Sequence, residues 1–298
     1  MTVLSLMLKA GHTVEIIRRL APDFESQFGI ALDIEVVSED DAYDRLTSGH
    51  DLPDICTVPY WYLPDLVNND ALTPLDPSDY PGCPHPLAES ALTYNNHLWG
   101  IPHTLTGGAL FTRPGMLPAD LAFDPRTFDE FIQMWDRVIE HGSSVAIRAA
   151  EAFSSAETYR GLLFAAGVRV FGPYDQLFSD AALEALGRIV DRIKRQAQML
   201  TRLDYAAMGG LLPAGKAAMM FDTSAWATLL PLDESVSEEI QFGPLADNPS
   251  APFFYAEGLG ITSECSNPGK ARAFIGWRHS AEVIREEVTS LNRVDFPR

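Results

Sequence analysis

The pattern of apolar and polar residues over the first 59 positions predicts alternating strands and helices. Apolar residues recur at helical spacing from Val14 to Phe28 and alternate with other residues from Ile30 to Val36. Strands that alternate with helices pair in parallel through right-handed crossovers, so the pattern predicts an α/β unit. Pro22 lies inside the first helix and is expected to kink or split it. The predicted order is a strand over 3–8, a helix over 14–28, a strand over 30–36, a helix over about 40–48 and a strand over 54–58.

Three aromatic residues, Tyr60, Trp61 and Tyr62, directly follow Pro59, which ends the apolar strand over 54–58. In an open α/β sheet, ligands bind outside the carboxyl ends of the strands. Two interpretations therefore stay open. The rings form a stacking platform for a ligand, or they cap a hydrophobic core.

The second half of the chain repeats this arrangement of a buried strand followed by polar and aromatic residues. Residues 217–221 are an apolar strand that ends at Asp222, and Trp226 lies just beyond it. Thr127 and Glu130 form a capping box, which predicts the start of a helix. The other predicted elements are a strand over 145–149, helices over 154–167 and 180–198, strands over 240–244 and 253–262, and helices over 268–279 and 281–291.

Two segments between these halves indicate loops and a domain boundary. Residues 73–94 are rich in proline and polar residues, which predicts mostly loop. Gly107 and Gly108 precede an apolar, extended segment and are a candidate hinge. We place the first domain boundary there.

The charge balance restricts the kind of ligand. The chain has 298 residues, with 41 acidic against 22 basic side chains and a net charge of −19. Such a balance argues against nucleic acid, anionic membranes and highly anionic ligands, and it fits a neutral or cationic ligand. No apolar run approaches the roughly 20 residues of a membrane span. The N-terminus lacks a basic residue before its apolar run and lacks a small-residue cleavage site, so it does not match a secretory signal.

No sequence motif makes a convincing case for catalysis or metal binding. The segment 210–217 nearly matches a phosphate loop, but Ala217 replaces the hydroxyl residue and the segment precedes a strand. Cys83 and His85 have no second cluster to complete a metal site. Cys56 is expected to be buried, and we expect Cys83 and Cys265 not to be bonded to each other. We therefore expect no enzyme, with no catalytic residues, no metal and no cofactor. Solvated surface is expected for His50, Asp51 and Asp54.

A set of aromatic and short polar residues remains at predicted strand ends and turns. Aromatic faces stack on the C–H face of a sugar, while carboxylate and imidazole groups bond to its hydroxyls. Taken singly, each residue is as consistent with a core or capping role as with ligand contact. Their recurrence at several strand ends favours a binding site. The set comprises His12, Tyr60, Trp61, Trp99, His103, Asp222, Trp226, Tyr255 and Glu257.

Five segments resemble, in order, the extracellular solute-binding proteins of ABC importers, in the sugar- and polyol-binding group that includes maltose-binding protein. The first, second and last of these segments are the most specific, and together the five span nearly the whole chain. The segments are GHTVEIIRRLAPDFESQFGI, GHDLPDICTVPYWYLPDLVNNDALTPLD, LWGIPHTLTGGALFTR, AGKAAMMFDTSAW and EGLGITSECSNPGKARAFIGWRHSAE.

The resemblance implies a two-lobe α/β fold, type II-like among periplasmic binding proteins. Each lobe is expected to be a mostly parallel sheet flanked by helices, and hinge strands join the two. The first lobe is expected to comprise 1–108 with 254–298, and the second 109–253. The ligand-binding residues implied by the resemblance are His12, Tyr60, Trp61, His103, Asp222, Trp226, Tyr255 and Glu257, although Glu257 occupies a position where the family more often has a small or aromatic residue.

The implied function is capture of a small neutral solute, a sugar or polyol, in the cleft between the lobes by hinge closure. The implied partners are ABC permease subunits, and the implied location is periplasmic or extracellular. The chain is expected to depart from the family pattern at both ends, because its N-terminus does not match a signal peptide and the second lobe is expected to lack the last helical segment. These departures leave open a cytoplasmic α/β enzyme acting on a small polar solute, or a truncated, ligand-silent homologue. They also suggest self-association through the incomplete lobe.

Overall fold

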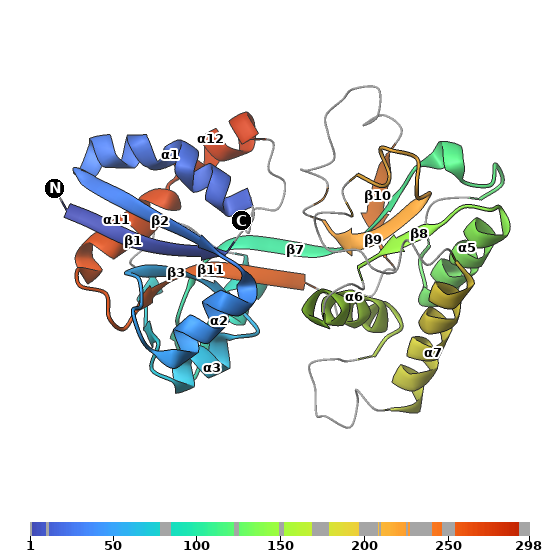
Figure 1. Cartoon of the computed structure of the whole chain (residues 1–298), viewed down its shortest axis with the longest axis horizontal. Coiled ribbons are helices and arrows are strands. Elements are labelled where there is room, and N and C mark those ends of the chain that lie inside the picture. Colours follow the sequence, from blue (N-terminus) through green and yellow to red (C-terminus); the bar gives the residue numbers. More distant parts are fainter. Residues whose placement is uncertain are drawn as a thin grey trace. The chain divides into compact units, whose positions relative to one another are not determined.

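The chain forms two compact units, which comprise residues 1–105 with 255–298 and residues 106–254. Each unit contains its own hydrophobic core, and strand β7 (Ile101–Thr112) begins in the first unit and ends in the second (Figure 1). The structure, a computed structural model, describes residues 2–9, 12–77, 85–121, 125–148, 152–168, 179–196, 208, 210–224, 226, 240–245 and 254–291.

A mixed sheet with parallel central strands forms the base of the first unit. β1 pairs in parallel with both β2 and β3, which confirms the predicted strand–helix–strand–helix–strand unit. β11 pairs antiparallel with β3, and the short β4 pairs antiparallel with β11. The strands are β1 (Thr2–Lys9), β2 (Ile30–Val37), β3 (Ile55–Pro59), β4 (Leu72–Thr73) and β11 (Phe254–Thr262).

Helices cover this sheet because each buries one apolar face. Ile16 and Leu20 of α1 pack with Val283 of α12 and Trp277 of α11, so these three helices lie together. α2 contacts α3 (Figure 1). Within the segment 73–94, for which the sequence predicts mostly loop, α4 and β5 form, and β5 pairs with β6 just beyond the segment in a small two-stranded ribbon. The elements are α1 (His12–Phe28), α2 (Glu39–Ser48), α3 (Leu63–Asn68), α4 (Pro86–Ala91), β5 (Thr93–Tyr94), β6 (His97–Leu98), α11 (Pro268–Arg278) and α12 (Ala281–Leu291).

α1 is one continuous helix, so the predicted split at Pro22 is wrong, while the alternative of a kink there stays a prediction. Proline has no N–H and cannot bond to the carbonyl one turn earlier, which normally interrupts a helix. Here Ile17 and Phe24, on either side of the proline, are fully buried. The ring centroid of Phe24 lies 5.2 Å from that of Phe274 on α11. Packing of both halves against the same core therefore keeps the helix intact.

Asp54, which was expected on solvated surface, is buried at the start of β3, so that prediction is wrong. Its carboxylate accepts hydrogen bonds from the Ser5 backbone N–H at 2.9 Å, the Ser5 hydroxyl at 3.0 Å and the Ser266 N–H at 3.1 Å. Burial alone raises the pKa of a carboxyl, but these donors outweigh it and hold the pKa of Asp54 below its ordinary value. The carboxylate thus ties β1 and the segment after β11 to the start of β3.

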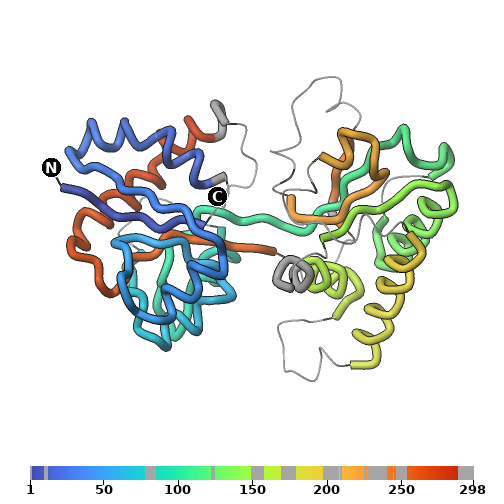
Figure 2. The backbone as a smooth tube through the Cα atoms, in the orientation of Figure 1, coloured from blue at the N-terminus to red at the C-terminus, as the bar shows by residue number. Residues whose placement is uncertain are grey.

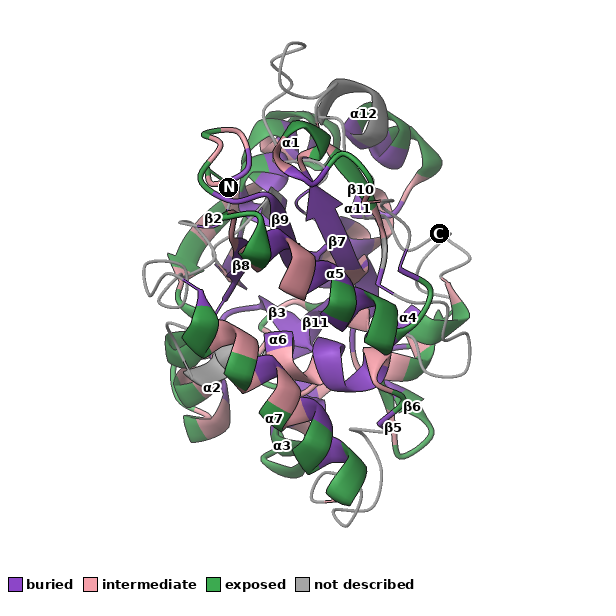
Figure 3. Ribbon diagram, turned by 90° about the vertical axis from the view of Figure 1, so that its right-hand side faces the viewer, coloured by how far each residue is buried: buried purple, intermediate pink, exposed green. Residues whose placement is uncertain are grey.

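The second unit is built on another mixed sheet. β9 pairs in parallel with β8 and antiparallel with β7, and β7 pairs antiparallel with β10. β9 is fully buried, as is β3 in the first unit, and Figure 3 shows both strands in the buried colour. The strands are β8 (Val145–Ile147), β9 (Met219–Thr223) and β10 (Gln241–Pro244). The α/β class predicted for the chain is confirmed.

Helix α5 of the second unit begins at the predicted capping box. The Thr127 side chain accepts from the Glu130 N–H at 3.2 Å, and the Glu130 carboxylate accepts from the Thr127 N–H at 3.1 Å. Phe131 and Trp135 are buried along the inner face of this helix. The side-chain oxygen of Gln196 accepts hydrogen bonds from the Trp135 indole N–H at 3.2 Å and from the Val145 N–H. Its amide nitrogen donates to the Val145 carbonyl. The helical elements are η2 (Pro114–Met116), α5 (Phe128–Glu140), α6 (Ala152–Ala165) and α7 (Asp180–Arg195).

Strand β7 passes from the first unit into the second without a break. Figure 2 shows the backbone of β7 running without interruption from one unit into the other. Gly107 and Gly108 lie inside this strand, and the Gly107 N–H bonds to the Ser224 hydroxyl at 3.1 Å. The compact units divide at 105/106 and 254/255, whereas the sequence placed these boundaries at 108/109 and 253/254.

Several minor sequence predictions also have outcomes. Residues 210–215 form turns that precede β9, in agreement with the rejection of a phosphate loop. Cys56 is fully buried, and burial raises the pKa of its thiol to about 12. Cys265 is a free thiol, while Cys83 lies outside the described residues. Within the described ranges, no helix is long and apolar enough to cross a bilayer.

Candidate functional site

The candidate site of the first unit lies where β1 and β3 end and β11 begins. Register places Glu257 of β11 opposite Pro59, the last residue of β3. The Tyr60 N–H then bonds to the Ala256 carbonyl at 3.1 Å, which fixes the chain as it leaves β3. Because β11 runs antiparallel to β3, its first residues meet the carboxyl ends of the parallel strands. This edge is where α/β sheets commonly bind ligands.

Two of the predicted aromatic residues form a pair at this edge. The ring centroids of Trp61 and Tyr255 are 4.7 Å apart, at an interplanar angle of 52°. Tyr60 meets Trp61 edge to face, with 5.1 Å between centroids. Tyr60 and Tyr62 also pack against the hydrophobic core. The structure therefore assigns core contact to Tyr60 and Tyr62, and it pairs Trp61 with a residue nearly two hundred positions away.

Lys9, the last residue of β1, was not singled out from the sequence, yet it lies at the centre of this cluster. Its ammonium forms ion pairs with Glu257 and with Glu39, the latter at 3.5 Å, and donates to the Tyr255 hydroxyl. It also lies 4.7 Å from the Tyr255 ring centroid and 5.7 Å from that of Trp61. The side chains of Lys9, Glu39 and Glu257 are only 19%, 20% and 8% exposed. A buried lysine needs such partners because an isolated charge is costly to desolvate.

Tyr62 borders this group and remains a neutral phenol near pH 7. Burial raises its pKa to about 12, and the nearby Glu39 carboxylate acts in the same direction. Its ring centroid lies 4.4 Å from that of Tyr43 on α2. The phenol therefore takes part in hydrogen bonding as a neutral group, and its partners include Trp61.

The two predicted histidines lie elsewhere in the first unit. His103 is fully buried on β7, where its Nδ1 lies 3.0 Å from the Thr104 hydroxyl and 3.5 Å from the Thr13 hydroxyl. His12 begins α1, and its side chain lies outside the described residues. Trp99 packs against the core and donates its indole N–H to the Tyr94 carbonyl at 2.9 Å, which favours a structural role.

Asp222 and Trp226, predicted for the second unit, are brought together with a residue that the sequence did not indicate. Arg148 follows β8 directly, and its guanidinium forms an ion pair with the Asp222 carboxylate at 2.8 Å. Their side chains are 7% and 0% exposed. Burial raises the pKa of Asp222, while Arg148, the Thr223 N–H and the Trp226 indole offset part of that effect. A signal existed in the sequence, because Arg148 stands at the end of the predicted strand over 145–149.

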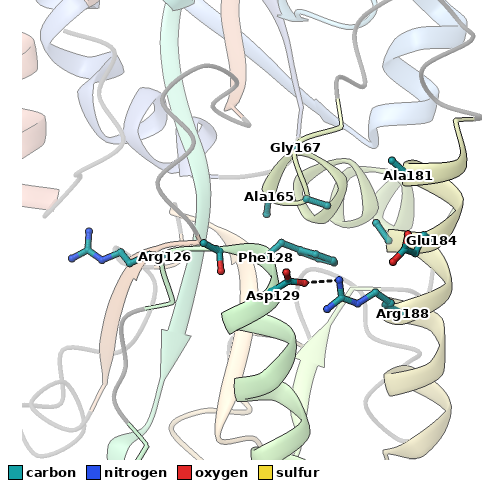
Figure 4. A pocket seen from close by; sticks show the side chains of 11 residues that line it. Arg126, Phe128, Asp129, Ala165, Gly167, Ala181, Glu184 and Arg188 are labelled. Carbon is teal, nitrogen blue, oxygen red and sulfur yellow. Dashed lines mark ion pairs between the residues drawn. The ribbon is translucent and has the colours of Figure 1, made fainter.

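A cavity of about 440 Å³ in the second unit contains none of the predicted binding residues. It lies between the start of α5, the end of α6 with the turn that follows it, and the N-terminal part of α7, as Figure 4 shows. Across it, Asp129 and Arg188 form an ion pair at 2.6 Å, and the guanidinium lies 5.2 Å from the Phe128 ring centroid. Asp129 and Arg188 of this cavity are thus already paired with each other. We place the candidate site at the strand ends, where aromatic faces and charged groups converge.

The chemistry available at the strand ends is recognition through ring stacking and charge-assisted hydrogen bonds. Each unit contributes an indole, a carboxylate and a cation: Trp61, Glu257 and Lys9 in the first, Trp226, Asp222 and Arg148 in the second. Among the described residues, no group of three or more His, Cys, Asp or Glu side chains is placed to hold a metal ion.

Comparison with solved structures identifies proteins of the same fold. One is an ABC transporter solute-binding protein of Thermotoga lettingae TMO bound to α-D-tagatose, with a TM-score of 0.83 and 18% identity over 100% of this chain and 82% of that chain. Another is an ABC transporter solute-binding protein of Agrobacterium vitis S4 with bound D-mannitol, with a TM-score of 0.82 and 16% identity over 100% of this chain and 77% of that chain.

A third similar structure is the maltose-bound MalE3 of T. maritima, with a TM-score of 0.81 and 17% identity over 100% of this chain and 82% of that chain. Comparison with curated protein sequences gives no match. The family model for the bacterial extracellular solute-binding protein, in contrast, matches residues 10–283, which is most of the chain. This chain therefore belongs to the bacterial extracellular solute-binding proteins.

Proposed function

We propose that this protein captures a sugar or polyol for an ABC importer. The observation that carries the proposal is the pairing of Trp61 and Tyr255 beside the Lys9 ammonium and the Glu257 carboxylate. A pyranose or an extended polyol presents C–H groups that stack on such rings. Its hydroxyls both donate and accept, so they can bond to an ammonium and a carboxylate that lie side by side.

The second unit presents a further group of proposed binding residues. Arg148, Asp222 and Trp226 repeat the same combination of cation, carboxylate and indole at another strand end. We include His12, Tyr60 and His103 among the proposed binding residues, as the resemblance implies. The proteins of the same fold with bound D-mannitol, ribitol and α-D-tagatose support a polyhydroxylated solute.

The proposal extends to the partner and the mode of capture. Membership of an extracellular family supports action in the periplasm or outside the cell and delivery to ABC permease subunits. We further propose that capture involves hinge closure, with the hinge in β7, where Gly107 and Gly108 lie. Small-angle X-ray scattering with and without solute tests this, since closure decreases the radius of gyration.

Isothermal titration against a panel of mono- and disaccharides, pentitols and hexitols tests the function. The expected result is micromolar or tighter binding of at least one solute, with affinity lowered about tenfold or more in Trp61→Ala because one stacking face is lost. Phe242→Ala is the matched control, since Phe242 is 57% exposed on β10 and belongs to no binding cluster. No binding across the panel, or equal affinity in both variants, contradicts the proposal.

We propose that binding involves no chemical step. The basis is family membership together with the pairing of the carboxylates by Lys9 and Arg148. Prolonged incubation of the protein with the solute identified by titration, followed by mass spectrometry, is expected to return the solute unchanged. Turnover that is lost in His103→Ala supports an enzyme instead.

A further inference from the structure

The Lys9 ammonium occupies a site of a kind that proteins use to bind cations. It donates to the Tyr255 hydroxyl, and the ring centroids of Tyr255 and Trp61 lie 4.7 and 5.7 Å from it. The carboxylates of Glu257 and Glu39 are its ion-pair partners. Aromatic faces attract cations through the ring quadrupole, and nearby carboxylates add direct charge attraction. The same groups without Lys9 are a receptor for a small organic ammonium ion.

We propose that Lys9 is a specificity-determining residue, an internal cation that fills this receptor and excludes amine-bearing solutes from the site. The inference rests on the proposed function in placing a solute against Trp61 and Tyr255. It deepens that function by assigning the charge class of the solute, which is neutral and hydroxyl-rich.

Competition explains why a tethered cation is effective. Lys9 reaches the site from the end of β1 in the same chain, so it acts at an effective concentration that free amines do not match. A cationic solute has to displace the ammonium from both carboxylates or lie beside it, and like charges in a poorly hydrated site repel each other. A neutral solute can instead accept a hydrogen bond from Lys9 while the ion pairs remain.

The net negative charge of the chain makes it more necessary to exclude cationic solutes from the site. A chain with a net charge of −19 attracts cations over its whole surface, so long-range electrostatics favour amines over neutral solutes. Lys9, Glu39 and Glu257 together carry a charge of −1, whereas the two carboxylates alone carry −2. Lys9 therefore reduces, at this site, the preference for cations that the net negative charge gives to the whole protein.

Chemical complementation tests the inference. Lys9→Ala removes the butylammonium side chain, and n-butylammonium chloride is the probe, with 1-butanol as its neutral counterpart. Binding is followed by calorimetry and by tryptophan fluorescence. We expect n-butylammonium to bind Lys9→Ala about tenfold or more tightly than wild type, with no such gain for 1-butanol. The gain is expected to disappear in Lys9→Ala/Glu257→Gln, because one carboxylate charge is lost.

Lys270→Ala is the matched control. Lys270 is in the same unit and bonds to the Thr2 hydroxyl, away from the aromatic pair, so no gain is expected there. If thermal unfolding by circular dichroism indicates that Lys9→Ala does not fold, Lys9→Met, which keeps an uncharged stem, is titrated with methylammonium instead. Equal affinity of wild type and the folded Lys9 variant for the ammonium probe overturns the inference. It then leaves Lys9 as a structural tie between β1 and β11.

A second pair of probes separates this inference from the proposed function. Sorbitol and 1-amino-1-deoxysorbitol differ only in one hydroxyl or ammonium group. The proposed function together with the inference predicts that removal of Lys9 shifts the preference toward the amine by about tenfold or more. A gain for n-butylammonium without binding of any sugar or polyol by wild type supports the role of Lys9 and contradicts the proposed function.

Discussion

Arg278 and Glu287 form a two-pronged ion pair between α11 and α12 in which both side chains are fully buried. One guanidinium nitrogen lies 3.0 Å from one carboxylate oxygen, and the other nitrogen lies 2.8 Å from the second oxygen. The two contacts set opposite charges against each other and so offset part of the cost of removing both groups from water. Its consequence for stability depends on which partner is changed, because a single buried charge costs more than the pair contributes.

Removal of one partner is therefore expected to destabilise the first unit. We expect Glu287→Ala to lose about 3–5 kcal/mol of unfolding free energy, because Arg278 is left buried without its carboxylate. The double variant Arg278→Met/Glu287→Leu is expected to lose much less, since no charge remains. Urea unfolding measures both, and Glu282→Gln, at an exposed position of α12, is the control with little change. A double variant as unstable as Glu287→Ala contradicts this account.

Asp54 gives the protein an acid-sensitive contribution to stability. Its pKa is held below the ordinary value, because hydrogen bonds from Ser5 and Ser266 outweigh the effect of burial. The folded state thus binds the proton less readily than the unfolded state. The stabilisation is full above the unfolded-state pKa and is lost as pH falls through the lowered folded-state pKa.

Asp54→Asn isolates this contribution. We expect it to lower the unfolding free energy at pH 7 by about 1–3 kcal/mol, because the amide accepts fewer of the available hydrogen bonds. The difference from wild type is expected to shrink as pH decreases below about 5. Thermal unfolding followed from neutral to acidic pH measures both effects. A difference that stays constant with pH indicates that the charge of Asp54 makes no contribution.

We expect glycine-to-alanine substitution to change the unfolding free energy in opposite directions at Gly258 and Gly187. A Cβ atom on Gly258 of β11 would lie 2.8 Å from the backbone oxygen of Ile101, which cannot move aside easily. Gly187 is in the middle of α7 with nothing within 4 Å of such an atom. We expect Gly258→Ala to lose about 2 kcal/mol or more and Gly187→Ala to gain about 0.5–1 kcal/mol. Urea unfolding compares them, and destabilisation by both variants refutes this pairing.

Asp222 tests whether the second unit takes part in solute binding. Asp222→Asn keeps the shape of the side chain and removes its charge, so we expect solute affinity to fall about tenfold or more. Asp136 of α5 is a matched control, because it also pairs with arginines of its own unit, Arg192 and Arg195 of α7. Titration with the solute identified in the panel is compared with that of Asp136→Asn. Equal affinities in the two variants remove Asp222 from the site.

Much of the fold follows from local sequence patterns. The alternation over 1–59 predicts the parallel β1, β2 and β3, and the capping box predicts where α5 begins. These predictions succeed because helix faces, caps and strand runs depend on neighbouring residues along the chain. Family membership is also encoded in such segments, since the match extends over residues 10–283.

Other features depend on residues that are distant in the sequence. Pro22 remains inside a helix because Phe24 packs against Phe274, and Asp54 is buried because Ser5 and Ser266 supply donors. Neither partner can be identified from the local pattern, which is why the predicted split of α1 and the predicted exposure of Asp54 are wrong. Tertiary packing outweighs local preference wherever burial supplies more free energy than the preference costs.

The sequence by itself determined the elements, the α/β class and the position of aromatic residues at strand ends. Only the tertiary structure placed Lys9 between Trp61, Tyr255 and two carboxylates, and placed Arg148 against Asp222. The physical reason is that strand pairing sets which ends meet. β11 returns beside β3 with Glu257 opposite Pro59, and the ends of β8 and β9 lie together through parallel register. Charge pairing across those ends is a property of the assembled sheet, to which residues far apart in the chain contribute.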